Sequence, residues 1–203
     1  MVARSPSNGR AARTRAELAH SAHDEFARTG VLDARAIAST AGVSTATFYA
    51  YFDTHDDAVA AALDISLAAV VNVAERHFHI EALLERGLEA VIDDIIHDTH
   101  AAFLAETLVM RAALARLAHH RAIRNVYRRH ETRCYDHLAR QIELGQKAGL
   151  LRDGDPARRA TSLLVLMQGI NNPLLTRQDL NEEIVADLRR AMTAVIGLTT
   201  PNA

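Results

Sequence analysis

The chain has little of what ends helices or holds small irregular folds together. Its 203 residues include nine Gly, four Pro and a single Cys. One cysteine excludes an internal disulfide and is compatible with a reducing compartment. Few, widely spaced Gly and Pro predict long elements of secondary structure. Aromatic residues make up only 4% of the chain and Trp is absent, so the core must come from aliphatic side chains. Such a core favours closely packed helices, and we predict an all-α fold.

Long hydrophobic runs are missing as well. Apolar runs such as 163–167 are far shorter than the roughly 18 residues that indicate a membrane span. The N-terminal stretch MVARSPSNGR contains no apolar segment typical of a signal peptide. These absences predict a soluble, cytoplasmic protein with no membrane partner.

The charge of the chain is nearly balanced but unevenly distributed. The net charge is −2, which gives no indication of nucleic-acid binding by itself. Residues 1–52 carry six Arg against four acids, whereas the remainder carries 17 bases against 21 acids. The first fifteen residues hold four Arg and no acid. This asymmetry predicts a basic N-terminal region attached to an acidic body.

Apolar periodicity and helix caps predict nine helices. In the N-terminal region we expect one helix over 13–28, a second capped by Asp33 and ended by Gly42, and a third from Ser44 to about Tyr51. In the body we expect helices over 54–77, 80–97, 99–119 and 122–148, one that begins at Pro156 and is broken by Asn172 and Pro173, and a last one capped by Asp179 or Asn181.

Small residues predict a tight corner between the second and third helices. Ala38 allows the two helices to approach closely, and Gly42 tolerates the positive φ that a sharp turn requires. Val43 and Phe48 would then point into the core of this region. Spacing alone leaves open the alternative of an ordinary helical hairpin.

The outward face of the third helix is small and rich in hydroxyl groups. Such a surface can enter a major groove about 12 Å wide, where threonines can hydrogen-bond phosphates or base edges. Thr and Ala can also contact thymine methyl groups. The outward residues are Thr45, Ala46, Thr47, Tyr49 and Ala50.

Three motifs between about Thr14 and Leu63 carry a family resemblance. They are F-x-x-x-G ending at Gly30, I-A-x-x-A-G-V-S ending at Ser44, and T-x-Y-x-Y-F ending at Phe52. Together they resemble the DNA-binding head of TetR-family transcriptional regulators, over about a quarter of the chain. The resemblance implies a homodimeric, usually repressing regulator of double-stranded DNA, whose body binds a small effector and whose last two helices form the dimer interface.

We expect four segments on this basis: a disordered basic arm (1–9), a helix-turn-helix DNA-binding domain (10–53), an effector-binding and dimerisation domain (54–198) and a disordered tail (199–203). The DNA-binding residues are predicted to be Arg13, Arg35, Ser44, Thr45, Ala46, Thr47, Tyr49, Ala50, Tyr51 and His55.

His55 is a departure from the family pattern. Family members usually have a Lys there that contacts a phosphate, and the neighbouring acids Asp53, Asp56 and Asp57 repel phosphate. We therefore assign phosphate contact to Arg35 and to the arm, although a merely solubilising arm is the alternative. The arginines of the arm are Arg4, Arg10, Arg13 and Arg15.

The segment TSLLVLMQGI predicts a dimer. It is apolar on nearly every face, so it must be buried on both sides. Paired with the last helix across a two-fold axis, it would form a four-helix bundle. Two recognition helices would then meet major grooves roughly 34–36 Å apart on a pseudo-palindromic operator. The predicted interface residues are Leu163, Leu164, Met167, Ile184, Leu188, Met192 and Val195.

Histidines leave a metal-sensing regulator as an alternative. His130, Cys134 and His137 lie at i, i+4 and i+7, and His97 and His100 form a second pair. Imidazole and thiolate at such spacing suit zinc, nickel or copper. The competing interpretation, a solvated stripe on a helix rich in Arg and Glu or the lining of an organic-ligand pocket, is favoured. We predict neither a metal nor a cofactor.

No motif for catalysis is evident. The chain lacks a nucleophile elbow, a phosphate loop and a triad-like cluster, and helix solubility explains its scattered acids. We therefore do not expect an enzyme. A purely structural helical bundle is a third class of protein, but it would leave the hydroxyl face unexplained.

Overall fold

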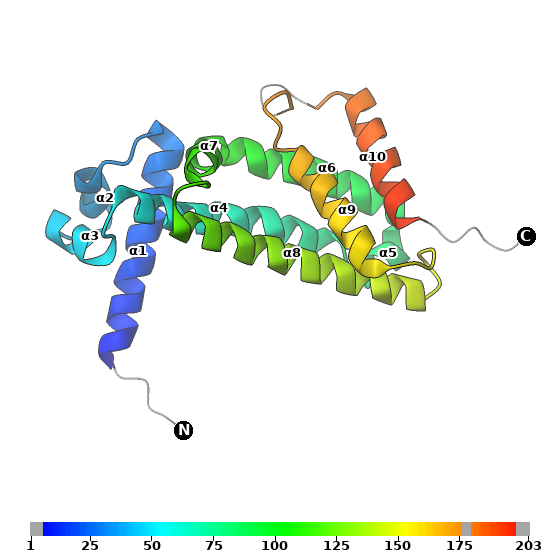
Figure 1. Cartoon of the computed structure of the whole chain (residues 1–203), viewed down its shortest axis with the longest axis horizontal. Helices are drawn as coiled ribbons and strands as arrows, with labels where there is room; N and C mark the ends of the chain where they lie inside the picture. The colour runs from blue at the N-terminus through cyan, green and yellow to red at the C-terminus, as the bar shows by residue number, and fades with distance from the viewer. Residues whose placement is uncertain (1–5, 176–179, 198–203) are drawn as a thin grey trace, which may run out of the picture. The chain divides into compact units, whose positions relative to one another are not determined.

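The computed structural model describes residues 6–175 and 180–197, and within them the chain forms ten α-helices (Figure 1). The predicted all-α class is confirmed. The helices are α1 (Pro6–Thr29), α2 (Ala34–Thr40), α3 (Thr45–Tyr51), α4 (His55–His77), α5 (Ile80–Arg86), α6 (Leu88–Ala105), α7 (Thr107–Arg116), α8 (Arg121–Lys147), α9 (Pro156–Gly169) and α10 (Glu182–Ile196).

The helices form two compact units. The first unit comprises Met1–Leu67 and Glu106–Arg128, and the second comprises Ala68–Ala105 and Arg129–Ala203. The division therefore passes through α4 and α8. The predicted functional boundary between residues 53 and 54 is a different kind of division and stays a prediction.

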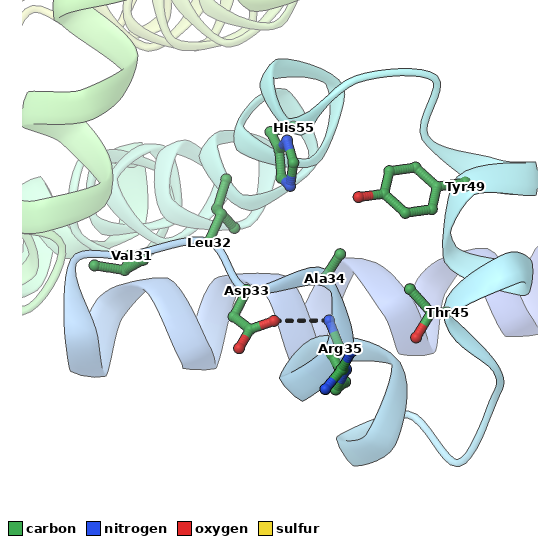
Figure 2. A pocket seen from close by; sticks show the side chains of 8 residues that line it. All are labelled: Val31, Leu32, Asp33, Ala34, Arg35, Thr45, Tyr49 and His55. Atoms are coloured by element: carbon green, nitrogen blue, oxygen red, sulfur yellow. Dashed lines mark hydrogen bonds between the residues drawn. The ribbon is translucent and has the colours of Figure 1, made fainter.

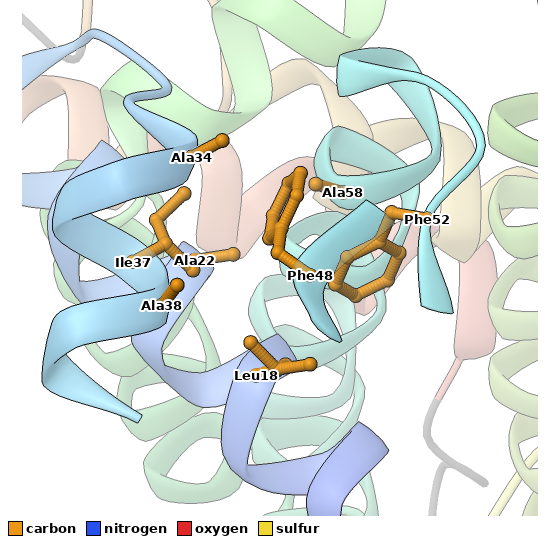
Figure 3. Packing of buried hydrophobic residues seen from close by; sticks show 8 residues of the cluster. All are labelled: Leu18, Ala22, Ala34, Ile37, Ala38, Phe48, Phe52 and Ala58. Atoms are coloured by element: carbon orange, nitrogen blue, oxygen red, sulfur yellow. The ribbon is translucent and has the colours of Figure 1, made fainter. Parts of the chain in front are cut away.

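The first unit has its own hydrophobic core at the meeting of α1, α2, α3 and the start of α4. Leu18, Ile37, Phe48 and Phe52 are each fully buried there. The rings of Phe48 and Phe52 lie 5.2 Å apart, and Figure 3 shows both rings directed into this cluster. Burying side chains of this size stabilises the fold by about 1.5–3 kcal/mol each. This core fixes the orientation of α3.

The first helix is longer than the periodicity predicted. It begins at Pro6 instead of Arg13, so residues 6–9 of the expected arm are helical. Pro suits the first position of a helix because its missing N–H would have no partner there. Arg4 and the expected tail, 199–203, lie outside the described residues.

The prediction for the middle of the chain is wrong in its boundaries. The expected helix over 80–97 is divided at Gly87, whose φ of +78° ends α5. The next helix then continues to Ala105, past the expected break at Asp98, and the chain turns at Glu106 instead. Apolar periodicity is nearly continuous here, so tertiary contacts decide where each helix stops.

The caps of the last two helices are confirmed. Asp155 accepts a hydrogen bond from the Ala157 amide at 2.9 Å, with Pro156 as the first residue of α9. Asn181 accepts one from the Ile184 amide at 2.8 Å and so begins α10. The alternative cap, Asp179, lies outside the described residues.

A buried arginine joins α9 to the end of α10 in the second unit. The guanidinium of Arg159 donates to the Ile196 carbonyl at 2.6 Å and to the Asp153 carbonyl at 2.7 Å. It also donates to the Arg152 carbonyl. Carbonyls at a helix C-terminus lack intrahelical donors, so this cation satisfies them and stabilises that end of α10.

One helix in the described part of the chain, α4, is long and apolar enough to cross a membrane. Its best window has a mean hydropathy of 1.7, but 56% of that window is buried inside the protein. A buried core helix passes the same test, so this is weak evidence for a membrane span.

Candidate nucleic-acid interface

The corner between α2 and α3 has the predicted geometry. Gly42 adopts φ +68°, and the Val43 amide donates to the Ala38 carbonyl at 2.9 Å across the turn. Asp33 accepts from the Arg35 amide at 2.8 Å and begins α2. Ser44 accepts from the Thr47 amide at 3.1 Å and begins α3. The α2–α3 pair is therefore a helix-turn-helix in which the side chain of the residue just before each helix caps its N-terminus.

The predicted DNA-binding residues between Ser44 and Tyr51 divide into three groups. Ser44 and Thr47 hydroxyls lie 2.9 Å apart and take part in the cap. Tyr51 is half-buried and packs against the core of the first unit. The remaining candidates point away from that core: Ala46, Tyr49 and Ala50 are exposed and Thr45 is half-exposed.

A groove of about 520 Å³ lies beside this face. Figure 2 shows the Tyr49 hydroxyl directed into the groove, with Arg35 and His55 on its rim. The rings of Tyr49 and His55 meet edge to face, 6.2 Å apart. The lining residues are Val31, Leu32, Asp33, Ala34, Arg35, Thr45, Tyr49 and His55.

A second groove, of about 370 Å³, continues this surface toward α7. It shares Val31, Leu32 and His55 with the first groove and adds Ala112 and Arg116. The sequence did not predict that α7 lies beside His55. The proximity depends on packing between α1 and α7, which no local pattern records.

The acids at the start of α4 have partners within the first unit. Asp57 accepts from the Thr54 amide at 2.9 Å, which confirms the predicted capping box. Asp56 forms an ion pair with Arg116 at 2.7 Å, and His120 lies 3.8 Å from Asp57. The Arg116 ion pair offsets the charge of Asp56, one of the acids that the sequence predicted to repel phosphate around His55.

The arginines assigned to phosphate contact differ in their surroundings. Arg10, Arg13 and Arg35 are exposed. Arg15 instead donates to the Tyr51 carbonyl at 3.0 Å and lies over the Phe52 ring at 5.4 Å. Arg15 therefore fixes α1 to the end of α3, and the structure leaves Arg10, Arg13 and Arg35 as the cations available to a ligand among these four.

A buried polar network in the first unit was missed by sequence reasoning. His23 of α1 donates to the Glu106 carboxylate at 2.8 Å, and Ser66 of α4 donates to the same oxygen at 2.5 Å. The Glu106 hydrogen bond, aided by Asp24, raises the pKa of His23 above its usual value despite burial. Burial alone would raise the pKa of Glu106, but the hydrogen bonds from His23 and Ser66 outweigh it and lower that pKa.

The metal candidates do not form a ligand set. The ring of His137 donates to the Phe78 carbonyl at 2.8 Å. Burial raises the pKa of the Cys134 thiol to about 12, which disfavours the thiolate that a metal needs. Among the described residues, no three His, Cys, Asp or Glu side chains, including His130, are placed to hold a metal ion.

Some of the predicted dimer-interface residues are already buried within the single chain. Leu163, Met167 and Met192 are buried in the core of the second unit. Leu164, Ile184, Leu188 and Val195 are half-buried. Val165 of α9, which the prediction omitted, is 60% exposed.

Residues 84–197 match the family model described as "BetI-type transcriptional repressor, C-terminal", which is more than half of the chain. The chain belongs to the TetR family of transcriptional regulators. This TetR-family protein is a ligand-responsive, DNA-binding transcriptional regulator, in agreement with the motifs of its N-terminal region.

Solved structures of low sequence identity share the fold. A TetR transcription regulator from Haloarcula marismortui ATCC 43049 is 19% identical, with 91% of this chain and 97% of that chain covered and a TM-score of 0.67. The multidrug binding protein EbrR, complexed with imidazole, is 22% identical over 92% and 96% with a TM-score of 0.65. A structure from Saccharomonospora viridis in complex with choline is 23% identical over 90% and 95% with a TM-score of 0.59. No curated protein matches the chain in sequence.

Proposed function

We propose that this TetR-family protein is a repressor that binds a pseudo-palindromic operator as a homodimer and is released by a small effector. One observation carries the proposal. The exposed face of α3 is small, neutral and hydroxyl-bearing, and it lies beside an open groove rimmed by Arg35 and His55. This combination suits contact with base edges from a helix whose phosphate contacts are made by its neighbours.

In this proposal the residues of α3 and of its neighbour α2 make different kinds of contact with DNA. Thr45 and Tyr49 supply hydroxyl groups, while Ala46 and Ala50 supply methyl groups for apolar contact with thymine. Arg35, at the start of α2, is exposed on the rim of the groove and contacts a phosphate. Ser44 and Thr47 act through the cap that fixes the first turn of α3.

The dimer is proposed to form through α9 and α10. Val165 is largely exposed, and Leu164 and Leu188 are only half-buried in the protomer. An apolar helix face of this kind is stabilised by a second copy packed across a two-fold axis. A strictly monomeric protein at micromolar concentration in light scattering would contradict this step.

The effector is proposed to bind in the helical body. Relatives of the fold have been solved with choline and with imidazole, so small organic ligands are the first to test. The hydroxyl of Thr99 is fully buried and has no hydrogen-bond partner in the part of the chain that the structure describes. A buried unpaired hydroxyl is costly, so a polar ligand atom there would relieve the cost. We expect Thr99→Val to reduce the thermal shift produced by any ligand that stabilises the wild type.

This function requires no catalysis and no cofactor. We also propose that it acts in the cytoplasm, because a regulator of this function must reach the chromosome.

The decisive experiment is selection of bound duplexes from a random pool, followed by affinity measurements on the recovered sequence. We expect two half-sites related by a pseudo-dyad and centred about one helical turn apart, or a multiple of it. Thr45→Val and Tyr49→Phe should weaken binding to that sequence, because each removes one hydroxyl of α3. Tyr135→Phe in α8 is the matched control and should leave affinity unchanged. A pool that shows no enrichment, with and without candidate ligands, would refute the proposal.

A further inference from the structure

The first unit contains a second source of positive charge besides α1. Residues 107–128 carry five Arg and two His and contain no Asp or Glu. They form α7, the connection after it and the first two turns of α8. We call this segment, 107–128, the α7–α8 elbow.

The elbow borders the surface that carries the recognition helix. Arg116 pairs with Asp56 at the start of α4, and it lines the same groove as His55. His55 in turn lies 6.2 Å from the Tyr49 ring and lines the groove of α3. One continuous surface therefore leads from Tyr49 over His55 to Arg116.

Three arginines of the elbow are available to an external anion. Arg111, Arg121 and Arg128 are exposed, and within the described ranges none of them pairs with a carboxylate. Arg124 is different, because its guanidinium donates to the Leu117 and Ala118 carbonyls at the end of α7.

Helix stability does not explain this concentration of charge. Arg121 is the first residue of α8, and the first turn of α8 contains no acid. The dipole of a helix disfavours a cation at this end and favours an anion. A cation that is unfavourable for its own helix is characteristic of a functional surface, where binding outweighs helix stability.

We propose that the α7–α8 elbow binds phosphates of duplex DNA that flank the half-site bound by α3. The inference rests on the proposed function, because it takes α3 to be in the major groove. Each strand carries one phosphate per ~3.4 Å of helix axis, so a surface that extends beyond Tyr49 meets phosphates beyond the contacted bases. DNA is favoured over an acidic protein because the elbow continues the groove of the recognition helix. The elbow then supplies the cation that His55 does not.

The test compares Arg121→Gln and Arg128→Gln, singly and together, with Arg140→Gln. Arg140 is exposed on the same helix, belongs to the second unit and has no carboxylate partner in the described structure. Binding is measured by fluorescence anisotropy over a range of salt concentrations. The probes are a mixed-sequence duplex of about 40 base pairs, which extends past two half-sites one helical turn apart, and the sequence recovered by selection.

We expect each elbow variant to make the slope of log K against log salt shallower by about 0.9 for each phosphate that the dimer no longer binds. The decrease should be equal on the two duplexes, since phosphate contacts carry no sequence information. Arg140→Gln should retain the wild-type slope. Replacing both elbow arginines by Lys should retain it too, which separates the removal of charge from damage to packing. Circular dichroism and light scattering check that each variant is folded and assembled.

Trimming the duplex gives a second, independent readout. Removing the base pairs outside the half-sites should lower wild-type affinity toward that of the double Gln variant and leave the variant unchanged. The inference would be overturned if both elbow variants kept the wild-type salt slope, or if trimming lowered the affinity of all proteins equally. Either result would leave the proposed function intact. It is also the result expected if the elbow binds an acidic protein instead of DNA. A wild type without preference for any duplex would instead refute the proposed function.

Discussion

The network of His23, Ser66 and Glu106 predicts a pH-dependent stability that can be separated from the rest of the chain. The pKa of His23 is raised in the folded protein, above 6.5. Its contribution to stability is therefore fully present below about pH 6.5 and is lost as pH rises through the folded pKa. The pKa of Glu106 is lowered, so its contribution is present above its unfolded pKa of about 4.5 and is lost as pH falls through the folded value. The pair is most stabilising between these two limits.

The magnitude follows from the geometry of the pair. The side chains of His23 and Glu106 are only 15% and 11% exposed, and they are joined at 2.8 Å. A hydrogen bond between charged groups that are largely buried contributes about 1.5–3 kcal/mol. We therefore expect His23→Gln to lower the free energy of unfolding by about 2 kcal/mol at pH 6. For a chain of this length that corresponds to a decrease in Tm of about 4–8 °C.

The assay is thermal and chemical unfolding of wild type and His23→Gln between pH 6 and 8.5. All measurements use one protein concentration, because the stability of the proposed dimer would depend on it. The difference between the two proteins should be largest at pH 6 and shrink as His23 loses its proton. In a Glu106→Gln background the same change should show little dependence on pH, which completes a double-mutant cycle. His119→Gln, an exposed histidine of the first unit, is the matched control and should cost little. A difference that stays constant over this range would refute the reasoning.

Three further predictions concern stability and reactivity. Gly42→Ala should destabilise by about 1–2 kcal/mol in chemical unfolding, because φ is +68° although no atom lies within 4 Å of an added Cβ. Gly9→Ala is equally uncrowded but lies in α1 without positive φ, so it should be neutral or stabilising by up to about 1 kcal/mol, and equal effects of the two changes would contradict the strain argument. Arg159→Met should cost about 3 kcal/mol or more in thermal unfolding by leaving buried carbonyls without donors, and full stability in that variant would argue against the role assigned to the guanidinium. Cys134, with a pKa raised to about 12 by burial, should react with a thiol reagent at pH 8 only after unfolding, and rapid labelling of the folded protein would contradict its burial.

The helix-turn-helix was predictable because its determinants are local. Gly42 sets a positive φ, Asp33 and Ser44 cap the helices that follow them, and Phe48 lies at the position that must face inward. Each signal lies within a few residues of the feature it specifies. The same holds for Asp155 at the start of α9.

The middle of the chain was not predictable for the opposite reason. The break at Glu106 coincides with hydrogen bonds to His23 and Ser66, which are 83 and 40 residues away. Nearly continuous apolar periodicity on both sides provides no local signal that could compete with them. The Gly87 break did have a local signal, a glycine, which the continuous periodicity concealed.

The candidate site also combines features that are local in the sequence with features that depend on long-range contacts. The residue types on α3 were evident, but the use of Ser44 and Thr47 in the cap appears only in three dimensions. The ion pair of Arg116 with Asp56 joins residues 60 positions apart, so no local pattern connects α7 with the start of α4. The absence of any acid from 107–128 was a visible signal for the elbow. A comparison of net charge between residues 1–52 and the remainder does not reveal it, because the acids of the rest of the body outnumber these bases.

In the proposed function, together with the inference about the elbow, different elements carry the two tasks of DNA binding. Sequence preference depends on hydrogen bonds and methyl contacts from a neutral helix, and these are insensitive to salt. Affinity depends on arginines of α1, α2 and the elbow, and removing any one of these cations weakens binding to every sequence alike. Changes at Thr45 or Tyr49 should therefore alter the ratio of specific to non-specific affinity, whereas changes at Arg121 or Arg128 should alter both affinities and leave that ratio unchanged. If the elbow variants shifted the ratio instead, the arginines would have to lie against base edges, and the neutral face of α3 would no longer account for recognition.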